Sequence, residues 1–433
     1  MLSLMLVPMF GMIGLVADMG YMHFVKMSDQ TAAEAAAQAA IIDMHATLGG
    51  SAWTCTTTGV TCATTPTNCT ANITTPTSSV DVGCMYAQQH GFNSTNQWVT
   101  YTAGVNGTPP TASGSGSASY WITYRVIQKV PQMFSAILGN MSGMVASRST
   151  ASIQGATDCI YALDPSAPGA VQVDGTAALT SSCGIYDNSS DGSALGTNGG
   201  GTLSAPEYDV VGGVNTHYAL SPTPNTGVSH ITDPLSTLPV PATGPYVCNQ
   251  TNYSLQTNST TPVNINPGVY CGGIQVKKGT LNLTAGTYVL VGGGIYTQDS
   301  NANLTGTDVL IYNTYNSTTS PYNGAFSNNN ISAGSTVQLK ASNSGTWAGI
   351  LFFDDRTAPA GTDTYGGNSS SYYQGTFYAK NEGLMLYGTS SVNAKYTIIV
   401  ADTIELKGTA SLGNDYSQLP NGFSPLQKLV MVE

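Results

Sequence analysis

The segment MLSLMLVPMFGMIGLVADMGYMHFVKMSDQTAAEAAAQAA, residues 1–40, decides the fold class because it differs from everything that follows it. Residues 1–17 are apolar apart from Ser3, which is close to the roughly 17–25 residues that cross a bilayer. The helical pattern continues from Asp18 through an Ala-rich stretch to Gly49 and Gly50, which act as a stop signal. The sequence therefore predicts one helix over residues 1–50, about 70 Å long and kinked at Pro8.

The apolar half of this helix needs a cover, because in water it would expose too much apolar surface. The first basic residue is Lys26 and no small-residue cleavage site follows the apolar run, so we expect the segment to be retained. One interpretation is a single-span membrane anchor. The other is a pilin-type helix that rests in the membrane and then packs with identical helices in a filament, where small residues permit close approach. The predicted filament-core residues are Met1, Leu2, Met5, Pro8, Gly11, Gly14, Asp18, Gly20, Lys26, Ala33 and Ala36.

Asp18 is the only acidic residue within the apolar half of the helix. A buried carboxylate without a partner is costly, so Asp18 needs a cation or several donors. The α-amino group of a neighbouring Met1 is one candidate, and Lys26 of another subunit is a second. Alternatively, Asp18 marks the membrane boundary and faces water.

The composition excludes several classes of protein. The chain has 433 residues, of which only 8% are charged, with 12 Lys and Arg against 23 Asp and Glu. No basic patch can neutralise phosphates, so we expect no nucleic-acid partner. The length predicts a multidomain chain of two or three units. The acidic balance suits a surface exposed to water.

Eight cysteines indicate an oxidising compartment. None forms a C-x-x-C motif, so the spacing of zinc ribbons and thioredoxin-like sites is absent. We expect pairing between cysteines that are close in sequence, Cys159 with Cys183 and Cys248 with Cys271. The cluster Cys55, Cys62, Cys69 and Cys84 should pair among itself, and the sequence leaves its three connectivities open.

Two further regions follow the helix. The sequence of residues 51–157 predicts a small disulfide-bonded α+β head. β-Branched and aromatic residues alternate over 120–127 as in a strand, and a return strand is expected over 143–153. Between them, Pro131 is expected to open a short helix that stops at Gly139. Residues 158–433 have almost no helix signal, and short β runs recur about every 20 residues, as at 384–389 and 404–409. This period predicts a mainly-β parallel β-helix, a solenoid whose coils bury their apolar face by stacking. A β-sandwich is the alternative.

Other parts of the region show the same period, and its turns predict a polar ladder. Glycines 268, 286 and 306 begin successive similar segments, 18 and 20 residues apart. Turn asparagines are expected to form ladders between coils, namely Asn301, Asn303, Asn328, Asn329 and Asn330.

No catalytic, cofactor or metal site emerges from the sequence. Asp354, Asp355 and Arg356 with Asp363 resemble paired acids near a base, but adjacent residues of a strand point to opposite faces. The scattered histidines, His23, His45, His90, His217 and His230, lack HExxH spacing, and the glycine runs lack the Lys of a phosphate loop. Residues 299–303 imitate the start of a calcium loop, but Leu304 and Leu310 occupy its glycine and glutamate positions. We expect a protein that is not an enzyme and needs no cofactor.

Two N-terminal runs, GLVADMGY at 14–21 and QTAAEAAA at 30–37, resemble the N-terminus of TadE/TadG-like proteins of tight-adherence (Flp) pilus systems. Later runs are similar to the C-terminal halves of large TadG-like proteins, namely CIYALDPSAPGA at 159–170, PGVYCGG at 267–273, AGILFFDDR at 348–356 and IIVADTI at 398–404. The resemblance implies an exported pilin-like subunit or pilus-assembly factor without a cofactor. Common type IV pilins carry Glu at mature position 5, where this chain has Met5, so their charge docking does not carry over.

The sequence thus predicts a structural subunit of an extracellular, cell-surface filament. Its partners would be copies of itself through the N-terminal helix, the inner membrane before assembly, and surface glycans or other cells. A membrane-anchored Tad pilus assembly factor or adhesin is the first alternative. A polysaccharide-active β-helix enzyme is the second.

Overall fold

A computed structural model describes residues 2–48, 53–92, 97–106, 118–132, 134–139, 141–315, 326–390, 394–419, 422 and 424–432. The chain divides into two compact units. The first contains residues 1–155 and 427–433, and the second contains residues 156–426. The last residues therefore leave the 158–433 region to which the sequence assigned them, because strand β31 pairs with β4 of the first unit.

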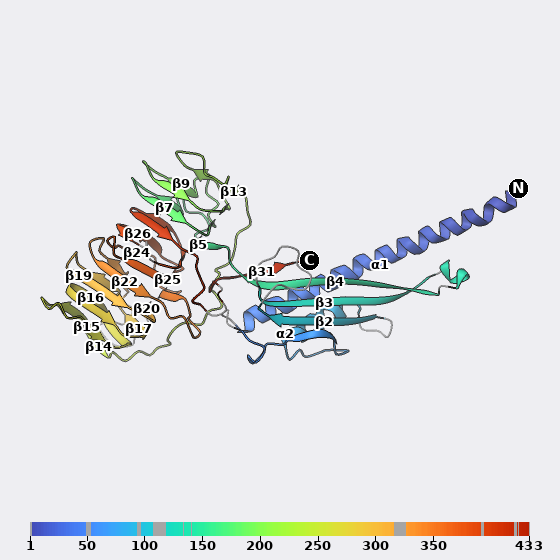
Figure 1. Cartoon of the computed structure of the whole chain (residues 1–433), viewed down its shortest axis with the longest axis horizontal. Coiled ribbons are helices and arrows are strands. Elements are labelled where there is room, and N and C mark those ends of the chain that lie inside the picture. The colour runs from blue at the N-terminus through green and yellow to red at the C-terminus, as the bar shows by residue number, and fades with distance from the viewer. Residues whose placement is uncertain are drawn as a thin grey trace. The chain divides into compact units, whose positions relative to one another are not determined.

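The first unit combines α1 (Leu2–Leu48) with a five-stranded antiparallel sheet in the order β1-β2-β3-β4-β31. Figure 1 shows α1 running along this sheet, with its N-terminal part extending beyond it. A second helix, α2 (Ser79–Gln89), is capped at its N-terminus by Ser78, whose Oγ accepts the N–H of Asp81 at 3.2 Å. The strands are β1 (Ala63–Asn68), β2 (Gln97–Val105), β3 (Ala118–Pro131), β4 (Ser142–Gly155) and β31 (Gln427–Met431).

A short 3₁₀ helix, η1 (Ser135–Leu138), lies at the tip of the β3–β4 hairpin. Pro131 ends β3 and does not open the helix as predicted. Gly139 closes η1 with φ of 98°, a left-handed conformation that favours glycine. The helix α1 is continuous through Pro8, while its predicted stop at Gly49 and Gly50 lies outside the described residues.

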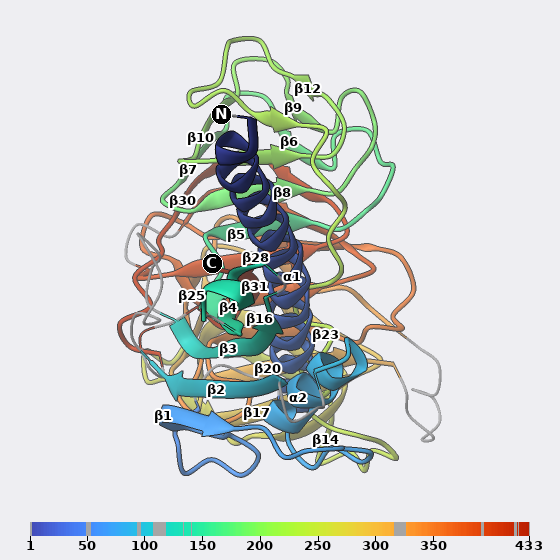
Figure 2. The same cartoon turned by 90° about the vertical axis from the view of Figure 1, so that its right-hand side faces the viewer.

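The second unit is mainly β, and the pairings between its strands are parallel. Successive strands lie above one another as layers, as Figure 2 shows for β28, β5 and β8. One stack follows the order β14, β16, β17, β20, β23, β25, β28, β5, β8, β11, β13. A second stack connects β16, β18, β21, β24, β26, β29, β6, β9 and β12.

The strands of the second unit are short and follow one another along the chain. Their bounds are β5 Asp158–Ala162, β6 Val171–Val173, β7 Ala178–Ser181, β8 Gly184–Asp187, β9 Leu195–Thr197, β10 Thr202–Ser204, β11 Tyr208–Val210, β12 Val214–Asn215, β13 Asn225–Thr226, β14 Gln250–Gln256, β15 Val263–Ile265, β16 Gly268–Leu283, β17 Gly286–Val291, β18 Ile295–Thr297, β19 Ala302–Gly306, β20 Val309–Thr314, β21 Asn330–Ile331, β22 Thr336–Lys340, β23 Ile350–Asp354, β24 Thr362–Tyr365, β25 Tyr372–Ala379, β26 Gly383–Leu386, β27 Thr389–Ser390, β28 Thr397–Ala401, β29 Ile404–Leu406 and β30 Thr409–Leu412.

The layers do not follow the order of the sequence. Strand β5 pairs with β28, near the end of the unit, and the chain then proceeds through β8 and β11 to one end of the stack. Residues 227–249 return to the other end, where β14 starts the remaining layers. Consequently the two ends of the unit meet, and Ala156 N–H donates to the Leu426 carbonyl at 3.0 Å.

The predicted 20-residue repeat is confirmed at 384–389 and 404–409. Leu384 pairs with Ile404 and Thr389 with Thr409. A Cβ on Gly408 would meet the Gly388 carbonyl oxygen at 2.1 Å, so only glycine fits where the two layers touch. The glycines that begin the earlier segments are not aligned with one another, because Gly268 pairs with Tyr288 and Gly286 with Val309.

All eight cysteines form disulfides, and the pairs are Cys55–Cys62, Cys69–Cys84, Cys159–Cys183 and Cys248–Cys271. The last two are the pairs expected from the sequence. The structure selects the nearest-neighbour connectivity for the N-terminal cluster, because α2 presents Cys84 beside Cys69.

Non-reducing mass spectrometry should therefore find Cys159 linked to Cys183 and Cys248 linked to Cys271. Their sequence separations are 24 and 23 residues, so each bond should stabilise the second unit by about 3 kcal/mol through the shorter loops of the unfolded chain. Free thiols at these four positions in protein purified without reductant would contradict the assignment.

Candidate functional site

The candidate site is the surface of α1, the element that carries the predicted filament-core residues. One face of α1 is buried within the first unit and carries Val25, Asp29, Ala32, Ala36 and Ala40 at helical spacing. These side chains face β3, β4 and α2. Ala33 and Ala36 are fully buried there. Their small size serves the core of the head, so the expectation that they pack on neighbouring subunits is wrong.

Several large apolar side chains of α1 are exposed, and they are spread around the helix. Phe24 is 68% exposed and Val16 is 70% exposed. We refer to these residues together as the exposed α1 face, which consists of Leu15, Val16, Met19, Tyr21, Phe24, Met27 and Ile42. Large apolar side chains grouped on one helix mark a surface for association.

Asp18 has partners within its own chain. Its carboxylate accepts the backbone N–H groups of Phe134 at 3.1 Å and Ser135 at 2.8 Å, and the Ser135 hydroxyl at 2.9 Å. Asp18 is only 7% exposed, and it satisfies donors at the start of η1. The donors come from the hairpin tip, so the predicted partners Met1 and Lys26 of another subunit are not needed to satisfy this carboxylate.

The other predicted core residues have different surroundings. Gly14 lies against Phe134, and a Cβ at Gly14 would meet that side chain at 2.6 Å. Gly20 has nothing within 4 Å of such a Cβ. Lys26 is exposed, and its carbonyl accepts the Ser147 hydroxyl at 3.1 Å. Met1 and the side chains of Leu2, Met5, Pro8 and Gly11 lie outside the described residues.

The Asp18 contact predicts a local effect. Asp18→Ala removes the acceptor for the Phe134 and Ser135 amides, so amide hydrogen exchange at the hairpin tip should speed up by at least tenfold. Ser28→Ala, an exposed change on the same helix, is the control. Unchanged exchange at residues 134–139 would show that Asp18 does not hold the tip.

A second acid of α1, Asp29, is buried without a hydrogen-bond partner for either carboxylate oxygen. Burial raises its pKa from 3.8 to about 6. No sequence pattern predicts this burial, because Asp29 lies between the polar residues Ser28 and Gln30 in the middle of the helix. Its burial follows from the packing of α1 against the sheet.

Asp29→Asn should stabilise the first unit at pH 7–8 by about 1–3 kcal/mol and should have little effect near pH 4. A raised pKa favours folding below the unfolded value of 3.8, and this contribution is lost as the pH rises through about 6. Urea unfolding of both proteins across pH 4–8 measures the difference. Asp43→Asn, a partly exposed site on the same helix, is the control, and a gain that does not depend on pH would refute the explanation.

A shallow groove lies between α1 and α2. It is lined by Ala35, Gln38, Ala39, Ile42, Asp43, Ala46, Val82, Tyr86 and His90. Ile42 of the exposed α1 face and Tyr86 of α2 border it, and both are more than 40% exposed. The groove extends the apolar surface of α1 toward its C-terminal end.

The acids that the sequence placed near Arg356 separate as expected from strand geometry, but one of them gains new partners. Asp355 faces outward and accepts from Thr314 Oγ1 at 2.8 Å and Thr357 N at 3.0 Å. Partial burial raises its pKa, but these hydrogen bonds outweigh burial and leave the pKa below its usual value. Asp354 points inward and meets Asp363 and Glu382, a carboxylate that sequence analysis did not include.

Arg356 does not serve a catalytic pair. Its guanidinium donates to the carbonyl oxygens of Leu235 at 2.6 Å and Leu238 at 2.7 Å, and to the Tyr378 hydroxyl at 2.7 Å. Residues 227–249 are the connection that returns along the second unit, so Arg356 fastens this connection to β25. Cation–π contact with the Phe353 ring at 5.1 Å adds to it.

The remaining polar candidates have structural surroundings. Asp299 accepts the Asn301 N–H at 2.8 Å in a turn, and the histidines belong to neither cluster of possible metal ligands among the described residues. Only part of the Asn ladder forms as predicted: Asn303 donates to Thr280, whereas Asn328 and Asn329 bond to acids. Asn282 donates to Asn264 at 2.8 Å, a ladder pair that was not predicted.

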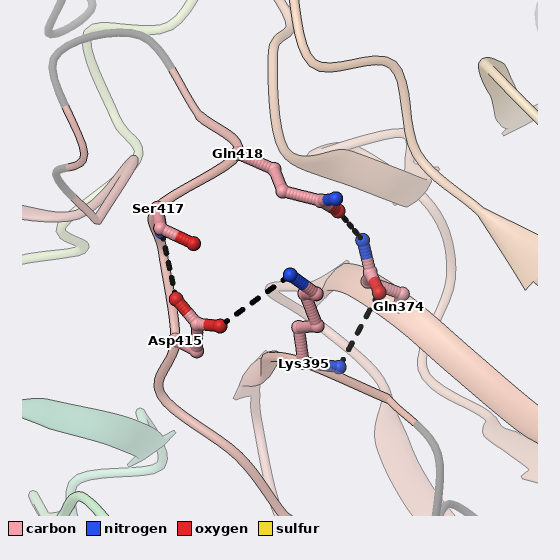
Figure 3. A network of polar contacts seen from close by, with 5 residues as sticks. All are labelled: Gln374, Lys395, Asp415, Ser417 and Gln418. Atoms are coloured by element: carbon pink, nitrogen blue, oxygen red, sulfur yellow. Dashed lines mark hydrogen bonds and ion pairs between the residues drawn. The ribbon is translucent and has the colours of Figure 1, made fainter.

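A polar network fixes the segment near residue 415 (Figure 3). Gln374 accepts the Lys395 N–H at 3.3 Å and donates to Gln418 Oε1 at 3.1 Å, and Lys395 Nζ lies 3.7 Å from the Asp415 carboxylate. Asp415 also accepts the Ser417 N–H. Lys395 and Asp415 are both about half exposed, so their ion pair contributes little stability. We assign the network a positioning role for this segment.

Residues 1–47 match the model of a protein family described as putative Flp pilus-assembly TadE/G-like. The match covers most of α1, including the exposed α1 face and Asp18. No curated protein and no solved structure matches the chain. Within the described residues, no helix has both the length and the apolar character needed to span a membrane.

Proposed function

We propose that the chain is a structural subunit of an extracellular pilus-like filament, in which α1 packs with the α1 helices of other copies. The observation that carries this proposal is the exposed α1 face, which lies in the segment that matches the TadE/G-like family model. The small residues Ala33 and Ala36 are buried within the first unit and are not available for contacts between subunits. The proposed contacts between subunits therefore involve large apolar side chains and the groove beside α2.

We further propose that the second unit is a parallel β-helix on the filament surface. The parallel pairings, the layered strands and the 20-residue step between Leu384 and Ile404 support this winding. They disfavour the alternative β-sandwich, whose sheets are antiparallel. Thr and Asn side chains on its turns would offer polar contacts to glycans or other cells.

The alternatives are a membrane-anchored Tad pilus assembly factor or adhesin, and a polysaccharide-active enzyme. The enzyme is the weaker one, because Asp354, Asp363 and Glu382 are each at most 2% exposed and a polysaccharide cannot reach them. We propose that the protein is not an enzyme. Release of reducing sugars from acidic polysaccharides, lost on Asp363→Asn, would reverse that assignment.

Phe24→Glu tests the assembly surface. The change places a charge on the exposed α1 face without touching the core, so the protein should fold normally but should lose sedimentable polymer. Val247→Glu is the matched control, because Val247 is 80% exposed in the second unit. If Phe24→Glu sediments like the parent protein, the exposed α1 face is not the subunit contact. A detergent-soluble monomer in both cases would favour the anchor.

A further inference from the structure

Three carboxylates converge in the interior of the second unit, and the proposed function does not use them. Asp354 lies at the end of β23, Asp363 lies in β24, and Glu382 directly precedes β26. Each is at most 2% exposed. One oxygen from each lies within 4.8 Å of the others.

The charges of this cluster are not balanced by neighbouring side chains. Among the described residues, the salt bridges lie elsewhere, between Lys395 and Asp415 and between Lys407 and Glu405. Arg356 is directed toward the 227–249 connection. Asp363 is well supplied with donors, since it accepts from Asn329 N at 2.8 Å, Asn329 Nδ2 at 2.9 Å and the Tyr365 hydroxyl at 2.8 Å.

The other two carboxylates are only half satisfied. Glu382 Oε2 accepts from Asn328 Nδ2 and Asp354 Oδ1 accepts from Asn329 Nδ2 at 3.5 Å, whereas Asp354 Oδ2 and Glu382 Oε1 are buried without a hydrogen bond. Asn313 adds a neutral oxygen: it pairs with Asp354 across β20 and β23, its amide contacts the Asp354 carboxyl, and its Oδ1 is also buried and unpartnered. Buried oxygens without partners are costly, and a cation bound by the carboxylates would remove that cost.

We propose that Asp354, Asp363, Glu382 and Asn313 form a structural calcium site inside the second unit. Carboxylate and amide oxygens, with no nitrogen or sulfur ligand, select a hard cation. The three carboxylate oxygens lie within 4.8 Å of one another, which is close enough to share one ion. Calcium accepts a set made up of protein oxygens, whereas magnesium usually keeps several water ligands, so we choose calcium.

The ion would join three layers of the second unit. Asn313 and Asp354 come from paired strands, Asp363 lies in the strand that follows Asp354, and Glu382 directly precedes β26, which pairs with that strand. The alternative to a bound ion is that the buried acids are protonated. Burial and then the charge of Asp363 raise the pKa of Asp354 well above its ordinary value, and the same causes raise the pKa of Glu382 to about 8.

The test compares thermal unfolding of the full chain in EDTA with unfolding in 1 mM Ca²⁺ or 1 mM Mg²⁺ at pH 7.5. Calcium should raise the midpoint by about 5 °C or more, and magnesium should raise it much less. Isothermal titration should give one Ca²⁺ per chain. Tb³⁺ bound at the same position should show luminescence sensitised by Tyr365, whose hydroxyl contacts Asp363.

Two variants separate the site from general calcium effects. Asp354→Asn with Glu382→Gln keeps the shape and imitates the protonated acids, so it should fold in EDTA but should lose the calcium shift and the Tb³⁺ signal. Asp209→Asn changes the other acidic cluster, formed with Asp158 and Glu207, and should keep both. An equal calcium shift in the double variant, or no shift in the parent protein, would overturn the proposal and leave protons as the solution.

Discussion

Phe352→Ala is expected to destabilise the second unit by about 3–5 kcal/mol, the largest effect of any single truncation considered. Phe352 is 1% exposed. Its ring centroid lies 4.7 Å from that of Tyr365 in β24 and 5.2 Å from that of Phe377, which pairs with it from β25. The lost ring would leave a cavity among stacked aromatic side chains that cannot collapse easily.

Urea unfolding, with hydrogen exchange to localise the change to residues 156–426, measures this loss. Tyr296→Ala is the matched control because Tyr296 is a 37% exposed aromatic residue of the same unit, and we expect less than about 1 kcal/mol for it. Equal losses at the two positions would mean that the aromatic stack is not what holds the layers together.

Gly83→Ala should have the second largest effect on stability. It should destabilise the first unit, although alanine is the better helix former. Gly83 lies in α2, where a Cβ would meet the Tyr124 hydroxyl at 2.3 Å and the Ala36 carbonyl oxygen at 2.6 Å. The clash forces α2 away from α1 and breaks the hydrogen bond from the Tyr124 hydroxyl to the Val80 carbonyl. We expect a loss of about 2–3 kcal/mol from the first unit.

Gly20→Ala makes the same chemical change in α1, where nothing lies within 4 Å of the new Cβ. It should stabilise the helix by up to about 1 kcal/mol, because alanine is the better helix former. Chemical denaturation of both variants measures the difference in sign. If both substitutions stabilise the first unit, the close contact between α1 and α2 at Gly83 is wrong.

Much of the local structure could be predicted from the sequence. The helix over residues 2–48, the β3–β4 hairpin and the repeat at 384 and 404 follow from local periodicity and turn residues. The order of the layers could not be predicted, because β5 pairs with β28 although they are far apart in the sequence. The spacing of a sequence repeat predicts which consecutive segments stack on each other. It does not predict that the last layers of the unit pair with its first strand.

The surroundings of α1 were predicted less well than its existence. Apolar periodicity along 1–50 is weak, since Ala, Met and Gly occur on all sides, so the sequence could not distinguish the face that packs on the head from the exposed one. Asp18 was correctly expected to need donors. They come from Phe134 and Ser135, more than one hundred residues away, and no local pattern announces a contact at that separation.

The cluster of Asp354, Asp363 and Glu382 could be predicted only in part. The rule that adjacent strand residues face opposite sides correctly separates Asp354 from Asp355. That rule concerns a single strand and cannot show that Asp354 meets Asp363 of β24 and Glu382, which directly precedes β26. Three inward carboxylates at positions 354, 363 and 382 become a signal only once the layers are known.

Electron microscopy of the purified full-length protein under assembly conditions tests the central proposal most directly. We expect helical filaments in which α1 helices form the core, with Phe24 and Met27 at contacts between subunits and the second unit outside. Phe24→Glu should give folded protein without filaments, while Val247→Glu should give filaments like the parent. Monomers that remain detergent-soluble in all three preparations, or filaments whose core lacks α1, would contradict the proposal.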